Sequence, residues 1–233
     1  MTPTIGILKP GSTFADMIVR FGDYDAWFTR ALGSAVRTRV HGPDGRLPGR
    51  ATADAWIITG ARSSVLDDDP RVGRLLEWIR GAVEEDVPLL GVCYGHQAVA
   101  AALGGRVERH PAGWELGTVE VELTDAGRSD PLFVGFPPRF PVQTTHEDQV
   151  VEPPPGATTL AWNEHSPFQA LAVGRACRTV QFHPEVDTPI AREFVDRRHH
   201  LLDRAPVVSE APLGGRVLAN FVRAFGPMKE PAP

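Results

Sequence analysis

The sequence predicts an α/β fold in which helices flank a mostly parallel central sheet, with a smaller antiparallel sheet in the second half. Strand-like runs alternate with segments of helical periodicity in the first half, which is typical of a parallel sheet wrapped by helices. In the second half, strand-like runs follow one another with little helix between them. The 233 residues, 42% of them hydrophobic, suit one sizeable core, so we expect a single domain over residues 1–233.

In the first half, apolar residues at helical spacing separate the strand-like runs. Phe14 and Met17 begin an apolar stripe that continues to Leu32, and a further helix is expected after Asp69-Pro70. Because the carboxyl ends of parallel strands meet at one edge of a sheet, segments that follow the third and fourth runs should lie close together. The four predicted strands are residues 4–8, 35–40, 54–59 and 87–92.

The second half contains five further strand-like runs. Residues 174–177 form a short, glycine-containing connection between the last two runs, which indicates an antiparallel hairpin. Helical segments are expected at about 188–204 and 213–225. The five predicted strands are residues 117–123, 139–143, 158–162, 168–173 and 178–182.

A cysteine lies where the fourth predicted strand gives way to a helix, in the heptapeptide Gly-Val-Cys-Tyr-Gly-His-Gln at residues 91–97. A nucleophile on such a tight turn, with glycine two positions away on each side, is the cysteine version of a nucleophile elbow. The helix N-terminus favours the thiolate of Cys93, and the backbone N–H of Tyr94 can donate to an oxyanion. The alternative is an inert cysteine of the core.

A candidate base and its partner follow the last predicted strand, in His183-Pro184-Glu185. Residues i and i+2 of an extended chain point to the same side, and the proline favours extended backbone at the histidine. The imidazole and the carboxylate can therefore lie side by side, as a general base and its orienting group do. Together with Cys93 they supply a nucleophile, a base and a partner for the base. Taken alone, the tripeptide is equally an ordinary turn.

These two motifs resemble those of the class I, or triad, glutamine amidotransferases, whose glutaminase domains carry Gly-x-Cys-x-Gly-x-Gln and a later His-Pro-Glu. The resemblance covers nearly the whole chain, and within the family it is closest to stand-alone proteins similar to the amidotransferase domain of GMP synthase. It implies a flavodoxin-like sheet and the catalytic triad Cys93, His183 and Glu185. The site residues that it further implies are Tyr94, Gly60 and Ala61 for the oxyanion hole, and Gln97, Thr145, His146, Glu147 and Asp148, the last four in a loop, for substrate binding.

The resemblance implies that glutamine is hydrolysed to glutamate and ammonia through a γ-glutamyl thioester, by a stand-alone amidotransferase or a glutaminase subunit. A separate synthetase or acceptor subunit is then a possible partner. Three alternatives stay open: a γ-glutamyl peptidase acting on peptides or conjugates, a non-catalytic binding or regulatory subunit, and a different cysteine hydrolase that shares the elbow. Glu147 stands where the family often has glycine, which bears on which γ-glutamyl compound fits. Ala61 stands where a second glycine is common, and it keeps its backbone N–H.

Bulk properties exclude other classes of function. The net charge of −5 gives no electrostatic case for nucleic acid. Two cysteines make no disulfide framework, and neither a signal peptide nor a membrane-spanning run is evident, so we expect a cytoplasmic protein without membrane partners. No nucleotide motif or zinc spacing occurs, and adjacent His199 and His200 would face different directions on a helix. We therefore expect no metal and no other cofactor.

Overall fold

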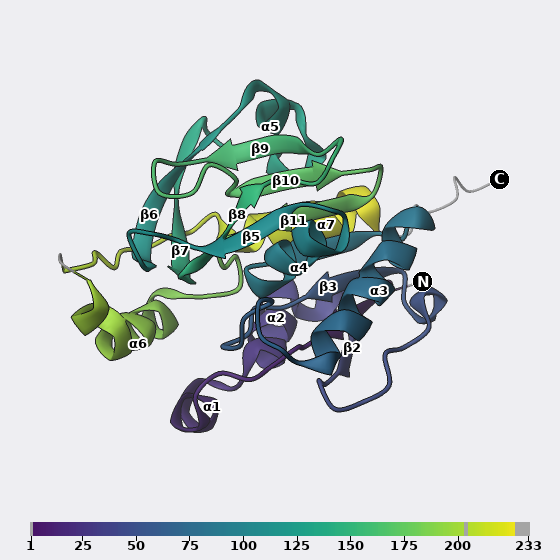
Figure 1. Cartoon of the computed structure of the whole chain (residues 1–233), viewed down its shortest axis with the longest axis horizontal. Coiled ribbons are helices and arrows are strands. Elements are labelled where there is room, and N and C mark those ends of the chain that lie inside the picture. Colours follow the sequence, from purple (N-terminus) through teal and green to yellow (C-terminus); the bar gives the residue numbers. More distant parts are fainter. Residues whose placement is uncertain (1, 203–204, 227–233) are drawn as a thin grey trace.

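A nine-stranded sheet runs through the molecule, and the first five strands in its spatial order are parallel (Figure 1). The computed structural model describes residues 2–202 and 205–226. The four inner strands of this half are buried along their whole length, as expected for parallel strands covered on both faces, and the edge strand is largely exposed. In spatial order the five strands are β2 (Arg37–His41), β1 (Thr4–Leu8), β3 (Ala55–Ile58), β4 (Leu89–Val92) and β11 (Cys177–Val180).

The remaining four strands continue the same sheet in antiparallel order. They are β10 (Ala170–Val173), β9 (Thr158–Trp162), β6 (Glu115–Leu123) and β7 (Arg139–His146). A separate antiparallel pair is formed by β5 (Arg106–Arg109) and β8 (Asp148–Glu152). The predicted fold class and the β10–β11 hairpin are thus confirmed. The strands β5 and β8 were missed because they are short and mostly polar, so neither has a strand-like apolar run.

Two pairs of helices cover the parallel half of the sheet. One core cluster packs α2 (Tyr24–Leu32) and α7 (Gly214–Phe225) against one face, and another packs α3 (Pro70–Glu84) and α4 (Tyr94–Ala102) against the other. The long helix α3 begins where the sequence predicts, since the Asp69 side chain caps it and Pro70 opens it. These two layers of helices leave the carboxyl ends of β3 and β4 accessible from one edge.

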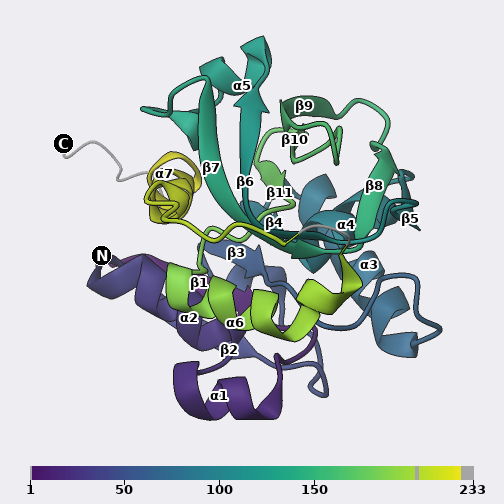
Figure 2. The ribbon, with the colours of Figure 1, turned by 90° about the vertical axis from the view of Figure 1, so that its left-hand side faces the viewer.

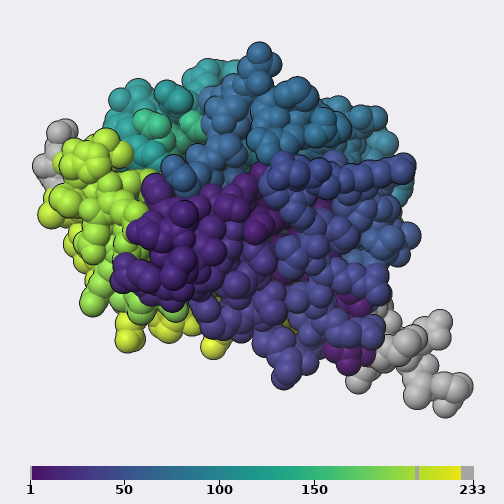
Figure 3. Space-filling view, turned by 90° about the horizontal axis from the view of Figure 1, so that it is seen from below, coloured from purple at the N-terminus to yellow at the C-terminus, as the bar shows by residue number. Residues whose placement is uncertain are grey.

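The N-terminal helix α1 (Ala15–Phe21) lies beside α6 (Thr188–Arg198), far along the sequence (Figure 2). Ion pairs join the two helices at Arg20–Glu193 and Arg197–Asp16. Seen from below, the purple N-terminal segment lies against the yellow-green segment that contains α6 (Figure 3). This contact closes one side of the molecule next to the carboxyl ends of the parallel strands.

Several helix bounds differ from the predicted ones. The apolar stripe that ends at Leu32 is divided between α1 and α2, because Gly22 adopts a φ of 82° and the Asp23 side chain then caps the second helix. The segment expected at about 188–204 ends as α6 at Arg198, followed by the 3₁₀ turn η4 (His199–Leu201); residues 203 and 204 lie outside the described part. Among residues 2–202 and 205–226, no helix is both long and apolar enough to cross a bilayer. Shorter elements, all 3₁₀ turns except α5, are η1 (Gly33–Ala35), η2 (Arg50–Thr52), α5 (Asp125–Ser129) and η3 (Pro131–Phe133).

Candidate active site

Cys93 is the single residue between strand β4 and helix α4, and its backbone is strained. Its φ of 51° and ψ of −100° lie in a region that L-residues rarely adopt. Within the described part of the chain, Asp86 is the only other non-glycine residue with positive φ. The turn leaves the Cys93 side chain lining a pocket instead of continuing the strand. The structure therefore contains the elbow that the sequence motif predicts.

The two flanking glycines are required by close backbone approaches. A Cβ atom on Gly91 would lie 2.6 Å from the Gly95 carbonyl oxygen. A Cβ atom on Gly95 would overlap the Ile58 carbonyl oxygen of strand β3. Since real Cβ contacts are longer, only glycine lets the turn fold back on itself and lets α4 pack against β3.

His183 and Glu185 form a buried hydrogen-bonded pair beside this turn. His183 Nδ1 lies 2.7 Å from Glu185 Oε1, and the two side chains are 2% and 0% exposed. The backbone N–H of His183 donates to the Gln143 carbonyl at 2.8 Å, which fixes the end of the last strand against β7. The i, i+2 spacing thus brings the imidazole and the carboxylate together, as predicted.

The second imidazole nitrogen of His183 faces the same pocket as Cys93. Nε2 is buried without a hydrogen-bond partner, and both side chains line that pocket. Burial opposes the charged imidazolium, but the Glu185 carboxylate and the Cys93 side chain outweigh it and raise the pKa of His183 to about 10. An imidazole oriented at one nitrogen and free at the other can pass a proton between a thiol and a bound molecule.

The segment that follows strand β3 packs against the His183 ring. A Cβ atom on Gly60 would lie 2.7 Å from His183 Cε1, so a larger residue would push the imidazole away. Ala61 lines the pocket beside Cys93. Within the described residues, the backbone N–H groups of Gly60, Ala61 and Tyr94 donate no hydrogen bond. Three unpaired donors from two sheet edges therefore border one pocket.

The segment Thr145 to Asp148 is not the loop that the resemblance implies. Strand β7 runs to His146 and β8 begins at Asp148, so only Glu147 separates two strands. This happens because the His146 ring is held at both nitrogens, 2.8 Å from Glu115 Oε2 and 3.1 Å from the Asp148 carbonyl. All four residues nevertheless line the pocket of Cys93.

Gln97 lies one turn into α4 and also lines the pocket, but its amide group is already engaged. Its Nε2 donates to the Asp148 carbonyl at 2.8 Å and to Gln181 Oε1 at 3.2 Å. Gln97 therefore ties the elbow helix to the start of β8, which positions the segment that faces Cys93. Within the described residues, no group of His, Cys, Asp or Glu side chains is arranged to hold a metal ion.

The fold adds pocket residues that sequence reasoning did not find. They come from four separate segments, and no spacing in the sequence links them to the cysteine motif. Only their convergence in space reveals them. They include Tyr24, Arg62, Arg109, Trp114 and Arg198.

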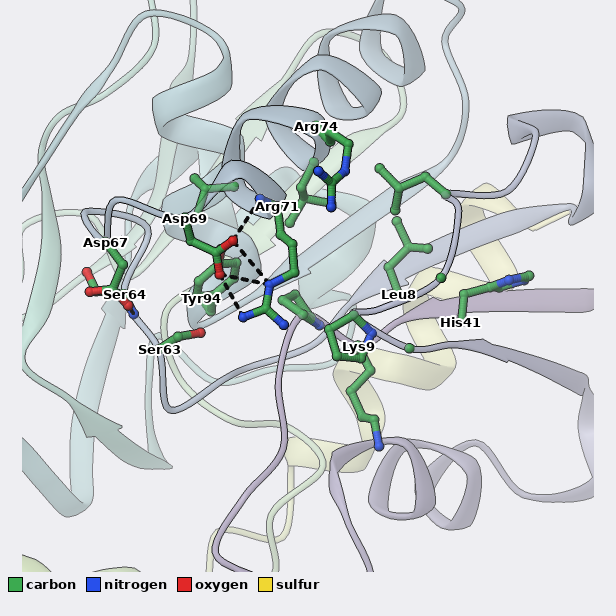
Figure 4. Close-up of a pocket in the computed structure, with 17 residues that line it drawn as sticks. Leu8, Lys9, His41, Ser63, Ser64, Asp67, Asp69, Arg71, Arg74 and Tyr94 are labelled. Atoms are coloured by element: carbon green, nitrogen blue, oxygen red, sulfur yellow. Dashed lines mark hydrogen bonds and ion pairs between the residues drawn. The ribbon is translucent and has the colours of Figure 1, made fainter.

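A neighbouring pocket lies beyond the carboxyl ends of β1 and β2 (Figure 4). Arg71 crosses it and donates to the Asp69 carboxylate at 2.8 Å. Its lining includes neither Cys93 nor His183, so it is not where these side chains meet a ligand. The two pockets share Ser63, Ser64, Asp67 and Tyr94.

Comparison with known proteins places this geometry in a family. The model of the family "Glutamine amidotransferase class-I" matches residues 47–196, more than half of the chain. A glutamine-hydrolyzing GMP synthase of Thermus thermophilus is 32% identical over 223 residues, covering 91% of this chain and 37% of the relative. That of Thermosipho melanesiensis is 29% identical over 229 residues, covering 97% and 37%. The chain thus spans just over a third of the length of these curated relatives.

Solved structures share the fold over almost their whole length. A glutamine amidotransferase from Methylobacillus flagellatus has a TM-score of 0.74 at 21% identity, covering 99% of this chain and 98% of the other. A glutamine amidotransferase from Thermotoga maritima has a TM-score of 0.73 at 17% identity, covering 97% and 98%. At such identities the likeness shows the fold alone. The family match over residues 47–196 goes further: the chain belongs to the class I glutamine amidotransferases.

Proposed function

We propose that this chain hydrolyses a γ-glutamyl amide, with glutamine as substrate and Cys93 as the nucleophile. The observation that carries the proposal is the strained elbow of Cys93 in one pocket with His183, whose other nitrogen bonds Glu185. A nucleophile, a base and a group that orients the base are the parts that acyl transfer requires. The family to which the chain belongs supports glutamine hydrolysis in general.

In the proposed reaction, His183 accepts the Cys93 thiol proton as sulfur attacks the amide carbon of the substrate. The adduct carries a negative oxygen that the N–H groups of Gly60, Ala61 and Tyr94 are free to bind, and each such donor typically lowers the barrier by about 3 kcal/mol. The raised pKa keeps His183 protonated near neutral pH. It can therefore protonate the leaving nitrogen as the C–N bond breaks, which releases ammonia and leaves a γ-glutamyl thioester.

Water completes the proposed cycle. His183 removes a proton from a water molecule that attacks the thioester carbon, the C–S bond breaks, and glutamate leaves. The sulfur takes back the proton, so Cys93 and His183 return to their starting states. We assign the α-amino and α-carboxylate ends of the substrate to Gln97 and residues 145–148, because they line the same pocket.

We further propose that any ammonia acceptor is a separate synthetase subunit, since the relatives that are GMP synthases are much longer than this chain. Residues 1–233 are proposed to form one domain, because one sheet connects both halves. The free thiols of Cys93 and Cys177 suit a reducing compartment, and we assign the protein to the cytoplasm.

The test is glutamate release from glutamine by the purified chain and two cysteine variants. Cys93→Ala should abolish release, because no other thiol in the described residues lines the pocket. Cys177→Ala is the matched control: that thiol is buried in β11, burial raises its pKa to about 12, and its removal should leave turnover within about twofold. Equal release by wild type and Cys93→Ala would reject the proposal, and absence of release from all three would favour a non-catalytic subunit.

A second candidate, hydrolysis of γ-glutamyl peptides, is favoured by one observation. The pocket contains a half-buried guanidinium, Arg198, beyond the groups that glutamine hydrolysis uses.

A further inference from the structure

Arg198, at the end of α6, places a positive charge in the candidate active-site pocket without a matching negative charge. Its guanidinium lies over three aromatic rings, 4.8 Å from the centroid of Trp114, 5.0 Å from Phe14 and 5.2 Å from Phe194. Nη1 is buried without a hydrogen-bond partner, and Arg198 forms no ion pair with any residue in 2–202 or 205–226. A buried charge without a counter-ion is costly, and a ligand anion would remove that cost.

The preceding residue shows how differently the fold treats an arginine that only stabilises structure. Arg197 forms ion pairs with Asp16 and, at 2.6 Å, with Glu193. The pocket-facing neighbour Arg198 packs against aromatic rings, which hold its planar guanidinium in one orientation. Such an arginine is prepared for the two-point recognition of a carboxylate.

The position of Arg198 points to the leaving-group side of the pocket. The Tyr24 ring stacks on the His183 ring, with centroids 6.3 Å apart. Tyr24 and Arg198 come from α2 and α6, which pack together, whereas Gln97 and Asp148 come from α4 and β8 (Figure 2). Because His183 protonates the departing nitrogen, whatever that nitrogen carries extends past His183 toward Tyr24 and Arg198.

We propose that Arg198 is a specificity-determining residue that binds a carboxylate on the leaving amine. The preferred substrates are then γ-glutamyl amino acids or peptides, whose departing amine carries a carboxylate, and glutamine is a poorer substrate. This rests on the proposed Cys93 chemistry: the thiolate displaces an amino acid instead of ammonia, His183 protonates its nitrogen, and water hydrolyses the thioester. Arg62 lies 4.0 Å above the Phe14 ring at the rim and adds positive charge to the same side.

Three substrates test the inference: γ-glutamylalanine, its C-terminal amide, and glutamine. Wild type should hydrolyse γ-glutamylalanine with a kcat/KM at least about tenfold above that of the amide, since a charged pairing is at stake. Arg198→Gln should remove this preference through a higher KM for γ-glutamylalanine, while the amide and glutamine stay within about twofold. Arg198→Lys keeps a charge but loses the planar fork, and should restore part of the preference.

The matched control is Arg192→Gln, which removes one positive charge from an exposed position of the same helix and should alter none of the three substrates. A wild type that treats γ-glutamylalanine and its amide alike would overturn the inference. So would an equal loss on all three substrates in Arg198→Gln, because that result would assign Arg198 to the α-carboxylate that all three share.

A binding measurement separates this inference from the proposed function. In a Cys93→Ala background, calorimetry should show that γ-glutamylalanine binds at least about tenfold more tightly than its amide, and that Arg198→Gln abolishes the difference. Charge-selective binding without any turnover by wild type would reject the Cys93 chemistry and keep the carboxylate site. Turnover without charge-selective binding would keep the chemistry and overturn the role of Arg198.

Discussion

At the scale of single residues, the candidate chemistry depends on where the His183 proton resides. The ring is buried, and burial alone would strip it of its charge. The Glu185 carboxylate at 2.7 Å and the Cys93 side chain reverse that effect and raise the pKa to about 10. One carboxylate therefore both orients the imidazole and keeps it charged.

Glu185→Gln should change how stability depends on pH. The folded-state pKa of His183 is raised from 6.5 to about 10, so its stabilising effect is complete below pH 6.5 and is lost as pH rises toward 10. In wild type, the free energy of unfolding from urea titrations should fall over this window, and the variant should show a smaller fall. Glu77→Gln, at an exposed position of α3, should follow wild type. Identical slopes in all three proteins would contradict the assigned charge state.

At the scale of secondary structure elements, the elbow depends on how closely β4, α4 and β3 approach one another. Gly91 and Gly95 bring backbone atoms to distances at which no side chain fits. The strained φ of Cys93 is then maintained by packing on both faces of the sheet.

Gly95→Ala should destabilise the protein by about 1–3 kcal/mol, because its methyl group would overlap the Ile58 carbonyl and push α4 away from β3. Urea denaturation measures the loss, and glutamate release should fall with it as the elbow moves. Gly73→Ala is the matched control on α3, where a Cβ atom meets nothing within 4 Å. That change should be neutral or stabilising by up to about 1 kcal/mol. Equal effects of the two substitutions would show that the elbow tolerates displacement.

Local signals predicted the elements whose pattern is complete within a few residues. The strands β1, β3 and β4 are buried apolar runs, and the elbow and His-Pro-Glu motifs each specify their own geometry. The strands β5 and β8 pair with each other through backbone bonds and lack an apolar run, so no local signal exists for them. The role of His146 as a bracket depends on Glu115, 31 residues away, which explains why a loop was expected.

At the scale of the whole molecule, one sheet joins the parallel and antiparallel halves. Strand β11 pairs with β4 on one side and with β10 on the other, and His183 follows directly from it. The pocket draws its residues from both halves, including Tyr24 and Ala61 from the first and Thr145 and Arg198 from the second. Arg198 could not be found from sequence, because its unpaired charge is visible only once these segments meet.

This continuity predicts a single cooperative unfolding transition. Far-ultraviolet circular dichroism and tryptophan fluorescence should give coincident urea curves, since Trp56 and Trp162 lie at opposite parts of the same sheet. Two separated transitions would show that the halves unfold independently and would reject the single-domain proposal.

The most direct test of the central claim, that Cys93 is an activated nucleophile aligned with a buried imidazole, is covalent labelling followed by mass spectrometry. A chloromethyl ketone that mimics glutamine should add one label per chain, on Cys93, in wild type and in Cys177→Ala. Cys93→Ala should take up none, and His183→Ala should react at least about tenfold more slowly, as expected for loss of a base. Labelling at Cys177, or an unchanged rate in His183→Ala, would contradict the account.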